Sequence, residues 1–348
     1  MECLLRYLYI FDIGDEIETN KIEKILNRVA RIFDIKLEKT IPTHIRIKDL
    51  PLKISIGKMK QENFDINLST KIFSTGSISI VLDIQKDIKS LDEIKEILNK
   101  INFEKIAKET KDKICKNMED CIVNFKKDGE FEEFLTIFLK VEKNVEEFVD
   151  HNKDKIAKIL EFDEVISKKT IDEIMKSNIN YYENELIIVS WSGAICINID
   201  NDEIEKISFI FEIANLQHLE LRVYDYEIDE LLKETIKKLK IKWYKALFGG
   251  MKKEIEKIME RRIEIQDIIE SAINMGKFFG DWYYAKVYEQ VKKELHIDEW
   301  RNSIMRKIDY MEEFYKSLQN SMNSTRSLFL ELMIVIIFIL DLIIIIAK

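Results

Sequence analysis

The chain has 348 residues, of which 46% are hydrophobic and 34% charged, a composition that supports folded cores and excludes a disordered chain. Its formal net charge of -9 argues against nucleic-acid binding by the protein as a whole, although it allows a local basic face. Four cysteines share no spacing typical of a metal site or a redox pair, so we expect reduced, structural thiols. Only nine glycines and two prolines occur, which favours long uninterrupted elements, mostly helices.

The N-terminal part predicts an α+β domain over residues 1–128. Residues 3–13 are rich in β-formers, and helical spacing of apolar residues follows, with Thr19 as the N-cap. Between residues 91 and 125 the apolar spacing is that of a long amphipathic helix or a helix pair. Alternating apolar and polar residues predict strands at 35–39, 44–48, 52–56, 64–68 and 77–84.

A second α+β unit is predicted over residues 129–225. Residues 134–141 read as a strand, and short helices follow around 144–176. The runs ELIIVSW and AICINI, separated by Ser192 and Gly193, predict a β-hairpin. A helix at 203–216 and a strand at 218–224 complete the unit.

The region 226–326 is predicted to be a helical hairpin or coiled-coil stalk. Apolar residues recur seven apart along its last helix, and an earlier stripe between residues 251 and 272 has similar spacing. The two helices could pack antiparallel in one chain or pair across a dimer. We interpret the stripe, together with one acid further on, as the contact of a homo-oligomer, formed by Ile304, Ile308, Met311, Leu318 and Asp341.

The last 22 residues, 327–348, read as a transmembrane helix. Residues 332–347 contain a single charge, Asp341, and 22 helical residues span about 33 Å, close to the thickness of a bilayer core. No basic n-region of a signal peptide occurs in residues 1–16. Lysines and arginines before the span outnumber those after it. We therefore expect a tail-anchored, single-pass protein of the cell membrane with a cytoplasmic N-terminal domain.

Catalytic and cofactor motifs are absent from the sequence, so we expect no enzyme activity, no cofactor and no metal. The one basic surface signal is the run 233–253, which holds eight lysines against one acid. Its plain interpretation is a solvated helix face. The alternative is a contact with ribosomal or other RNA, or with anionic lipid, for which the best candidates are Lys237, Lys238, Lys242 and Lys245.

The C-terminal region resembles the family named for "required for meiotic nuclear division" proteins. The resemblance is carried by the run from Asp281 to Ile343, in particular Leu330 and Glu331 at the start of the span and Asp341 within it. The Trp300–Arg301 and Lys307–Ile308 steps are similar to those of prokaryotic members, and VSWSGAICINI resembles a strand-turn-strand of the family around Gly193. The resemblance implies a membrane-anchored oligomer without assigned enzyme activity, whose mitochondrial relatives support translation.

These observations together favour an α+β protein with a stalk and an anchor. Its expected function is that of a non-enzymatic scaffold or tether, which links a macromolecular partner such as the translation machinery to the membrane. The alternative is a membrane-tethered enzyme or small-ligand-binding protein with a pocket between the two α+β units. A pocket with converging polar groups would favour the alternative.

Overall fold

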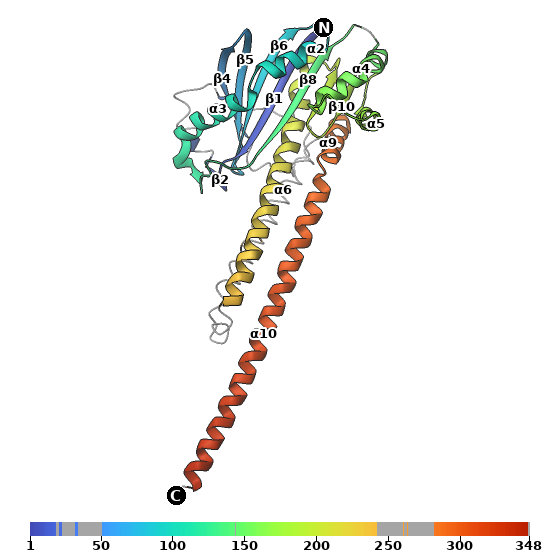
Figure 1. The fold of residues 1–348 in the computed structure, drawn as a ribbon. Helices are drawn as coiled ribbons and strands as arrows, with labels where there is room; N and C mark the ends of the chain where they lie inside the picture. Colours follow the sequence, from blue (N-terminus) through green and yellow to red (C-terminus); the bar gives the residue numbers. More distant parts are fainter. Residues whose placement is uncertain are drawn as a thin grey trace. The chain divides into compact units, whose positions relative to one another are not determined.

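The fold is described from a computed structural model of the whole chain (Figure 1). The structure describes residues 1–18, 21–22, 32–33, 51–142, 144–241, 260, 263 and 282–346. The predicted helix after Thr19 and the predicted strands 35–39 and 44–48 lie largely or wholly outside these residues.

A nine-stranded sheet forms the centre of the fold, in the order β3-β4-β5-β6-β1-β8-β11-β10-β9. Neighbouring strands are antiparallel except for β8 and β11, which are parallel. A separate antiparallel pair joins β2 (Glu16–Ile17) to β7 (Ile122–Val123). The strands of the large sheet are β1 (Glu2–Asp12), β3 (Ile32–Phe33), β4 (Leu52–Gln61), β5 (Phe64–Ile72), β6 (Ser77–Asp87), β8 (Phe131–Lys140), β9 (Asn178–Ile179), β10 (Leu186–Val189) and β11 (Gly193–Ile197).

Helices connect and cover these strands. Asn102, Asn144 and Ser167 cap the N-termini of α3, α4 and α5 by accepting hydrogen bonds from backbone amides of the first turn. The described helices are α2 (Asp92–Lys100), α3 (Phe103–Met118), the short 3₁₀ helix η1 (Glu119–Cys121), α4 (Val145–Leu160), α5 (Lys168–Lys176), α6 (Asn201–Ile241), α9 (Trp282–Glu294) and α10 (Ile297–Ile346).

The predicted α+β class is confirmed, and most of the predicted elements occur. The runs 3–13, 52–56, 64–68, 77–84 and 134–141 lie in β1, β4, β5, β6 and β8, and the predicted hairpin is β10–β11. The four cysteines are free and buried, as expected. The two α+β units predicted at 1–128 and 129–225 share one sheet, because β8 pairs along its length with β1.

The strand predicted at residues 218–224 is wrong, because α6 continues through it without a break. The alternation in HLELRVY suggested a strand with one polar face. Every residue from Ile213 to Leu221 is buried, however, so polar and apolar side chains are equally enclosed and the alternation does not mark a solvent face.

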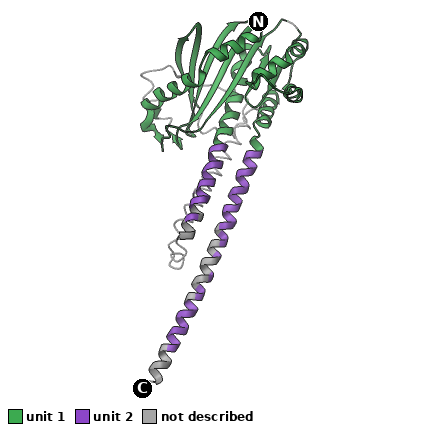
Figure 2. Ribbon diagram, viewed as in Figure 1, with its two compact units in different colours: residues 1–220, 272–298 green, residues 221–271, 299–348 purple. Residues whose placement is uncertain are grey.

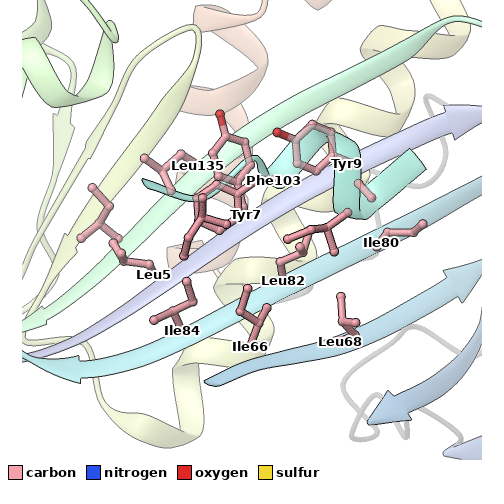
Figure 3. Packing of buried hydrophobic residues seen from close by; sticks show 14 of the residues in the cluster. Leu5, Tyr7, Tyr9, Ile66, Leu68, Ile80, Leu82, Ile84, Phe103 and Leu135 are labelled. Atoms are coloured by element: carbon pink, nitrogen blue, oxygen red, sulfur yellow. The ribbon is translucent and has the colours of Figure 1, made fainter. Parts of the chain in front are cut away.

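The two faces of the sheet differ in chemistry. Odd-numbered residues of β1 point to the face covered by α3, where Tyr7 stacks on Phe103 with ring centroids 4.9 Å apart. Figure 3 shows this layer of apolar side chains from several strands, and α3 and α4 pack on the same sheet. Because successive side chains of a strand alternate, Arg6 points to the opposite face and reaches Glu205 at the start of α6.

The chain divides into two compact units (Figure 2). Unit 1 comprises residues 1–220 and 272–298, and therefore contains the whole large sheet. Unit 2 comprises residues 221–271 and 299–348. Within unit 2, the Lys307 Nζ lies 2.8 Å from a carboxylate oxygen of Asp225 and 2.8 Å from one of Asp229, so α10 is joined to the distal part of α6.

Among the described residues, no helix carries an apolar stretch long enough to cross a membrane. The prediction of a transmembrane helix at 327–348 is therefore wrong, and so is the tail-anchored, single-pass cell-membrane localisation derived from it. Apolar side chains are described between Leu328 and Ile339 of α10, with Glu331 among them, and they follow a long polar stretch of the same helix. They are 41–68% exposed.

Candidate ligand-binding cleft

Arg6 is the first element of the site, and it lies in the middle of the central strand β1. It is paired in register with Asp83 of β6. The guanidinium donates from Nε to Oδ1 of Asp83 at 2.8 Å and from Nη2 to Oδ2 at 2.7 Å. The Arg6 side chain is only 11% exposed, and a charge buried to this degree requires such a bidentate partner.

Two lysines face each other across the neighbouring strands. Lys53 of β4 and Lys71 of β5 are direct cross-strand partners, an arrangement that is unfavourable for like charges unless acids offset it. Those acids come from α6, where Glu205 and Glu212 lie seven residues, about two turns, apart and so share one helix face. The helix therefore neutralises the basic side chains that the sheet presents.

Glu212 belongs to the buried end of this arrangement. Its carboxylate forms an ion pair with Lys71 and accepts a hydrogen bond from the Ser79 hydroxyl of β6. The side chains of Lys71 and Glu212 are 9% and 3% exposed. The Lys71 Nζ also lies 5.1 Å from the ring centroid of Phe209, in a cation–π contact.

Glu205 belongs to the open end. One of its carboxylate oxygens lies 2.7 Å from Nη2 of Arg6, and the other lies 3.3 Å from Nζ of Lys53. Its side chain is 58% exposed. Burial of the carboxyl alone would raise the pKa of Glu205, but the charges of Arg6 and Lys53 outweigh this effect and lower the pKa to about 2. The carboxylate is therefore ionised at any physiological pH.

These residues line a cleft of about 530 Å³ between the sheet and the first turns of α6. Its walls combine four basic side chains, three acidic ones, five hydroxyl or amide groups and an apolar floor of four side chains. The basic ones are Arg6, Lys53, Lys58 and Lys71, and the acidic ones are Asp83, Glu205 and Glu212. A concave site with converging polar groups over an apolar floor is typical of small-molecule binding.

A β-bulge shapes one wall of the cleft. The register between β4 and β5 shifts between Ser55 and Gly57, which leaves Ile56 as an extra residue in β4. Gly57 has a φ of 116°, which an L side chain rarely adopts, and a Cβ there would meet no atom within 4 Å. The bulge thus leaves open space at the cleft wall, next to the exposed Lys58.

Several polar groups of the cleft have no intramolecular partner among the residues that the structure describes. Lys58 forms no ion pair there, and Asn67 is exposed without a hydrogen bond. The Ser208 hydroxyl is buried and has no hydrogen-bond partner among the described groups. A buried hydroxyl without a partner costs free energy, so a ligand that supplies one would be favoured.

The opposite face of the sheet has a cavity of about 480 Å³ with different chemistry. Four aromatic rings line it, including Tyr7, Phe103 and Phe162, together with charged side chains such as Lys158 and Glu133. Burial raises the pKa of Tyr7, and the charge of Glu133 raises it further, so this phenol stays protonated.

A buried carboxylate lies further along α6, still within unit 1. Glu220 is 5% exposed, and neither of its oxygens forms a hydrogen bond with a described residue. The pKa of Glu220 is raised to about 7. Burial is the main cause, the Thr75 hydroxyl lowers the pKa in part, and the charge of Asp12 raises it. Asp12 itself pairs with Lys126 at 3.0 Å.

The lysines singled out from the sequence do not contribute to the cleft as far as they are described. Lys237 is exposed on the distal part of α6, the side chain of Lys238 is not described, and Lys242 and Lys245 lie outside the described residues. Of the predicted oligomer contacts, Ile304, Ile308 and Met311 are buried within the single chain. The side chains of Leu318 and Asp341 are not described.

Sequence reasoning missed the residues that form the cleft. A signal was present, because Arg6, Lys71 and Glu212 are each a lone charge within a mainly apolar run, and a charge in such a place needs a partner. What the sequence did not reveal is which of its 64 acidic residues supplies the partner. Among the described residues, no group of histidines, cysteines and acids is placed to hold a metal ion.

Comparison with known proteins gives a family but no function. Residues 4–203 match the family described as "Uncharacterized protein MJ0711, N-terminal domain", a range that includes Arg6, Lys53, Lys71 and Asp83 and ends just before Glu205. A relative named "Uncharacterized protein MJ0711", from Methanocaldococcus jannaschii, is 26% identical over 301 residues, which cover 86% of this chain and 87% of the relative. No solved structure matches.

These matches overturn the resemblance to the "required for meiotic nuclear division" family, for which they give no support. That resemblance rests mainly on residues 281–343, whose described part, 282–343, is largely helical and partly apolar. Heptad spacing and apolar runs are shared by many unrelated helical proteins, so these features were not specific to that family.

Proposed function

The chain belongs to the family of the MJ0711 N-terminal domain, and on that premise we propose that its α+β part binds a small ligand carrying an anionic group, such as a phosphate or a carboxylate. The observation that carries the proposal is the cleft of about 530 Å³, whose basic side chains outnumber its acidic ones. The proposal follows the small-ligand alternative of the sequence analysis, with the pocket between the sheet and α6.

The preference for an anion rests on the groups that remain available. Lys58 offers an ammonium without an ion-pair partner among the described residues, and Asn67 and Ser208 offer hydrogen-bond donors. A phosphate or carboxylate accepts several such bonds at once, and charge-assisted hydrogen bonds are the strongest of them. The apolar floor formed by Leu8, Val81 and other side chains suits the uncharged part of a small ligand.

Binding, rather than catalysis, is the role we infer for this cleft. Apart from Lys58, each of its acidic and basic side chains is held in an ion pair with another. An ion pair fixes the protonation state of both partners, whereas a general acid or base works best when its pKa lies near the operating pH.

Titration calorimetry with inorganic phosphate and with citrate tests the proposal on the full-length protein. We expect saturable binding of at least one of these probes, which Lys58→Met weakens about tenfold through loss of a charge-assisted hydrogen bond. The matched control is Lys60→Met, because Lys60 lies on the same strand, is exposed and does not line the cleft. Equal weakening by both variants, or no saturable binding by the unmodified protein, would refute the proposal.

A second candidate function, a scaffold that holds an RNA-containing partner, is favoured by the exposed Lys237 in unit 2. We propose that the predicted lysine face contributes charge attraction without base readout. Charge reversal at Lys237, Lys238, Lys242 and Lys245 should reduce cosedimentation with ribosomes or RNA. Unchanged cosedimentation of this variant would exclude the lysine face.

Self-association stays a proposal as well. Ile304, Ile308 and Met311 are already covered within one chain, so a second copy would have to use other surfaces. Among the described residues of unit 2, the exposed apolar side chains between Leu328 and Ile339 offer such a surface. Cross-linking of the full-length protein should then give a discrete oligomer that Ile334→Lys weakens, and a strictly monomeric species would exclude it.

A further inference from the structure

Glu205 is an exposed carboxylate in direct contact with Arg6 of the largely buried Arg6–Asp83 pair. Its side chain is 58% exposed, whereas those of Arg6 and Asp83 are 11% and 18% exposed. Glu205 comes from the first turns of α6, while the other two come from the sheet. Arg6 already has a bidentate carboxylate partner in Asp83 and does not need Glu205 to be satisfied.

The position that the Glu205 carboxylate occupies is built for an anion. One oxygen accepts from Arg6 Nη2 at 2.7 Å, and the other lies 3.3 Å from Lys53 Nζ. Lys71 adds a third positive charge that acts on the same carboxylate. The position lies on the wall of the cleft, so an anionic group of a bound ligand can reach it.

We propose that Glu205 is an internal stand-in for the anionic group of the ligand, which occupies the Arg6–Lys53 subsite in the empty protein and swings out when a phosphate or carboxylate binds there. This inference rests on the proposed ligand-binding function and adds to it where the anionic group binds and what competes with it. Because its side chain is largely exposed, the displaced carboxylate can be solvated by water.

The balance of charge explains why displacement matters. With Glu205 in place, Arg6, Lys53, Asp83 and Glu205 sum to zero, which offers an incoming anion no net attraction. Without Glu205 the same subsite carries a net positive charge. The internal carboxylate therefore lowers the apparent affinity for every anion, and selects ligands whose remaining contacts in the cleft compensate for its displacement.

The test is calorimetry of inorganic phosphate and citrate with the full-length protein, and the variant is Glu205→Gln. We expect about tenfold tighter binding of at least one probe, because the subsite gains a net charge without losing bulk. The matched control is Asp202→Asn, which changes the net charge by the same amount and lies three residues before Glu205 in α6. Asp202 is exposed and does not line the cleft, so its variant should bind like the unmodified protein.

A second substitution identifies the subsite. Lys53→Met in the Glu205→Gln background should return the affinity to about that of the unmodified protein, a loss of about tenfold. Lys53 is partly exposed, so this variant should fold even if one at Arg6 does not.

The outcomes separate this inference from the proposed function. If Lys58→Met weakens phosphate or citrate binding but Glu205→Gln binds no more tightly than Asp202→Asn, Glu205 is a structural ion pair and the stand-in role is wrong, while the binding function holds. If the unmodified protein binds a probe and Glu205→Gln binds it about tenfold more tightly than Asp202→Asn does, the binding function and the stand-in role are both supported. If no variant binds either probe, both proposals fail.

Discussion

The two faces of the large sheet bury side chains of different chemistry. On the face toward α3, side chains such as Tyr7, Ile80 and Ile137 form one continuous apolar cluster. On the face toward α6, Arg6, Lys71 and Asp83 are enclosed as well, and each is balanced by an opposite charge. An apolar face is stabilised by the area it removes from water, whereas a buried ion pair depends on both partners being present. The face toward α6 therefore depends more on the identity of each residue, and a single substitution destabilises it more easily.

The largest effect on stability should follow from removing one partner of the buried Lys71–Glu212 ion pair. Lys71→Met leaves the Glu212 carboxylate buried without its cation, and we expect a loss of about 3–5 kcal/mol in the free energy of unfolding. Urea denaturation measures it. Lys71→Met combined with Glu212→Gln should recover most of the loss, because the neutral amide can still accept from Ser79. A double variant as unstable as the single one would contradict this account.

The next effect concerns pH and Glu220. Its pKa rises from 4.5 to about 7 on folding, because burial disfavours the charged carboxylate. The folded state therefore binds the proton more tightly, so the stabilisation is complete below pH 4.5 and is lost as the pH rises to about 7. The loss by pH 8 is on the order of 3 kcal/mol.

Glu220→Gln should remove this dependence. Its urea midpoint should exceed that of the unmodified protein at pH 8 and approach it at pH 4. Other groups, such as Asp12 and Lys126, titrate in both proteins, so the difference between the two curves is the measured quantity. Parallel curves for the two proteins would show that folding does not shift the pKa of Glu220.

A smaller effect is expected on the apolar face. Ile137→Val removes one methylene from a fully buried side chain of β8 and should cost about 1 kcal/mol, since the neighbours close only part of the space. The control is Ile56→Val, at the 41% exposed bulge residue of β4, where the change should stay within about 0.5 kcal/mol. Equal losses at the two positions would mean that the bulge residue is covered by another part of the protein.

The smallest effect lies at the turn that joins β4 to β5. Glu62 is exposed and has a φ of 53°, a left-handed conformation that costs a residue with a Cβ more than it costs glycine. Glu62→Gly should raise the free energy of unfolding by about 0.5 kcal/mol, measured by urea denaturation. The matched change Asp65→Gly, within β5, should instead lower it, because glycine weakens a strand interior.

The comparison of the two faces also explains how far the sequence could be interpreted. Alternating apolar residues revealed β5 and β6 because half of each strand faces a purely apolar cluster, whereas β1 was revealed by its content of β-formers. The same rule misread residues 218–224, because α6 is enclosed on all sides as far as Leu221 and its buried polar groups imitate an exposed strand face. The cleft depends on pairs such as Arg6 with Glu205, 199 residues apart, and no local pattern encodes such a distance.

The position of β1 has a consequence for biosynthesis. β1 is synthesised before both of its neighbours, yet it lies in the interior of the sheet, between β6 and β8. Its first neighbour is complete only when residue 87 has been made, and its second only at residue 140. Until then β1 has an open hydrogen-bonding edge, which invites pairing with other nascent chains. β1 therefore needs protection during translation, although most of its side chains are buried once both neighbours have paired with it.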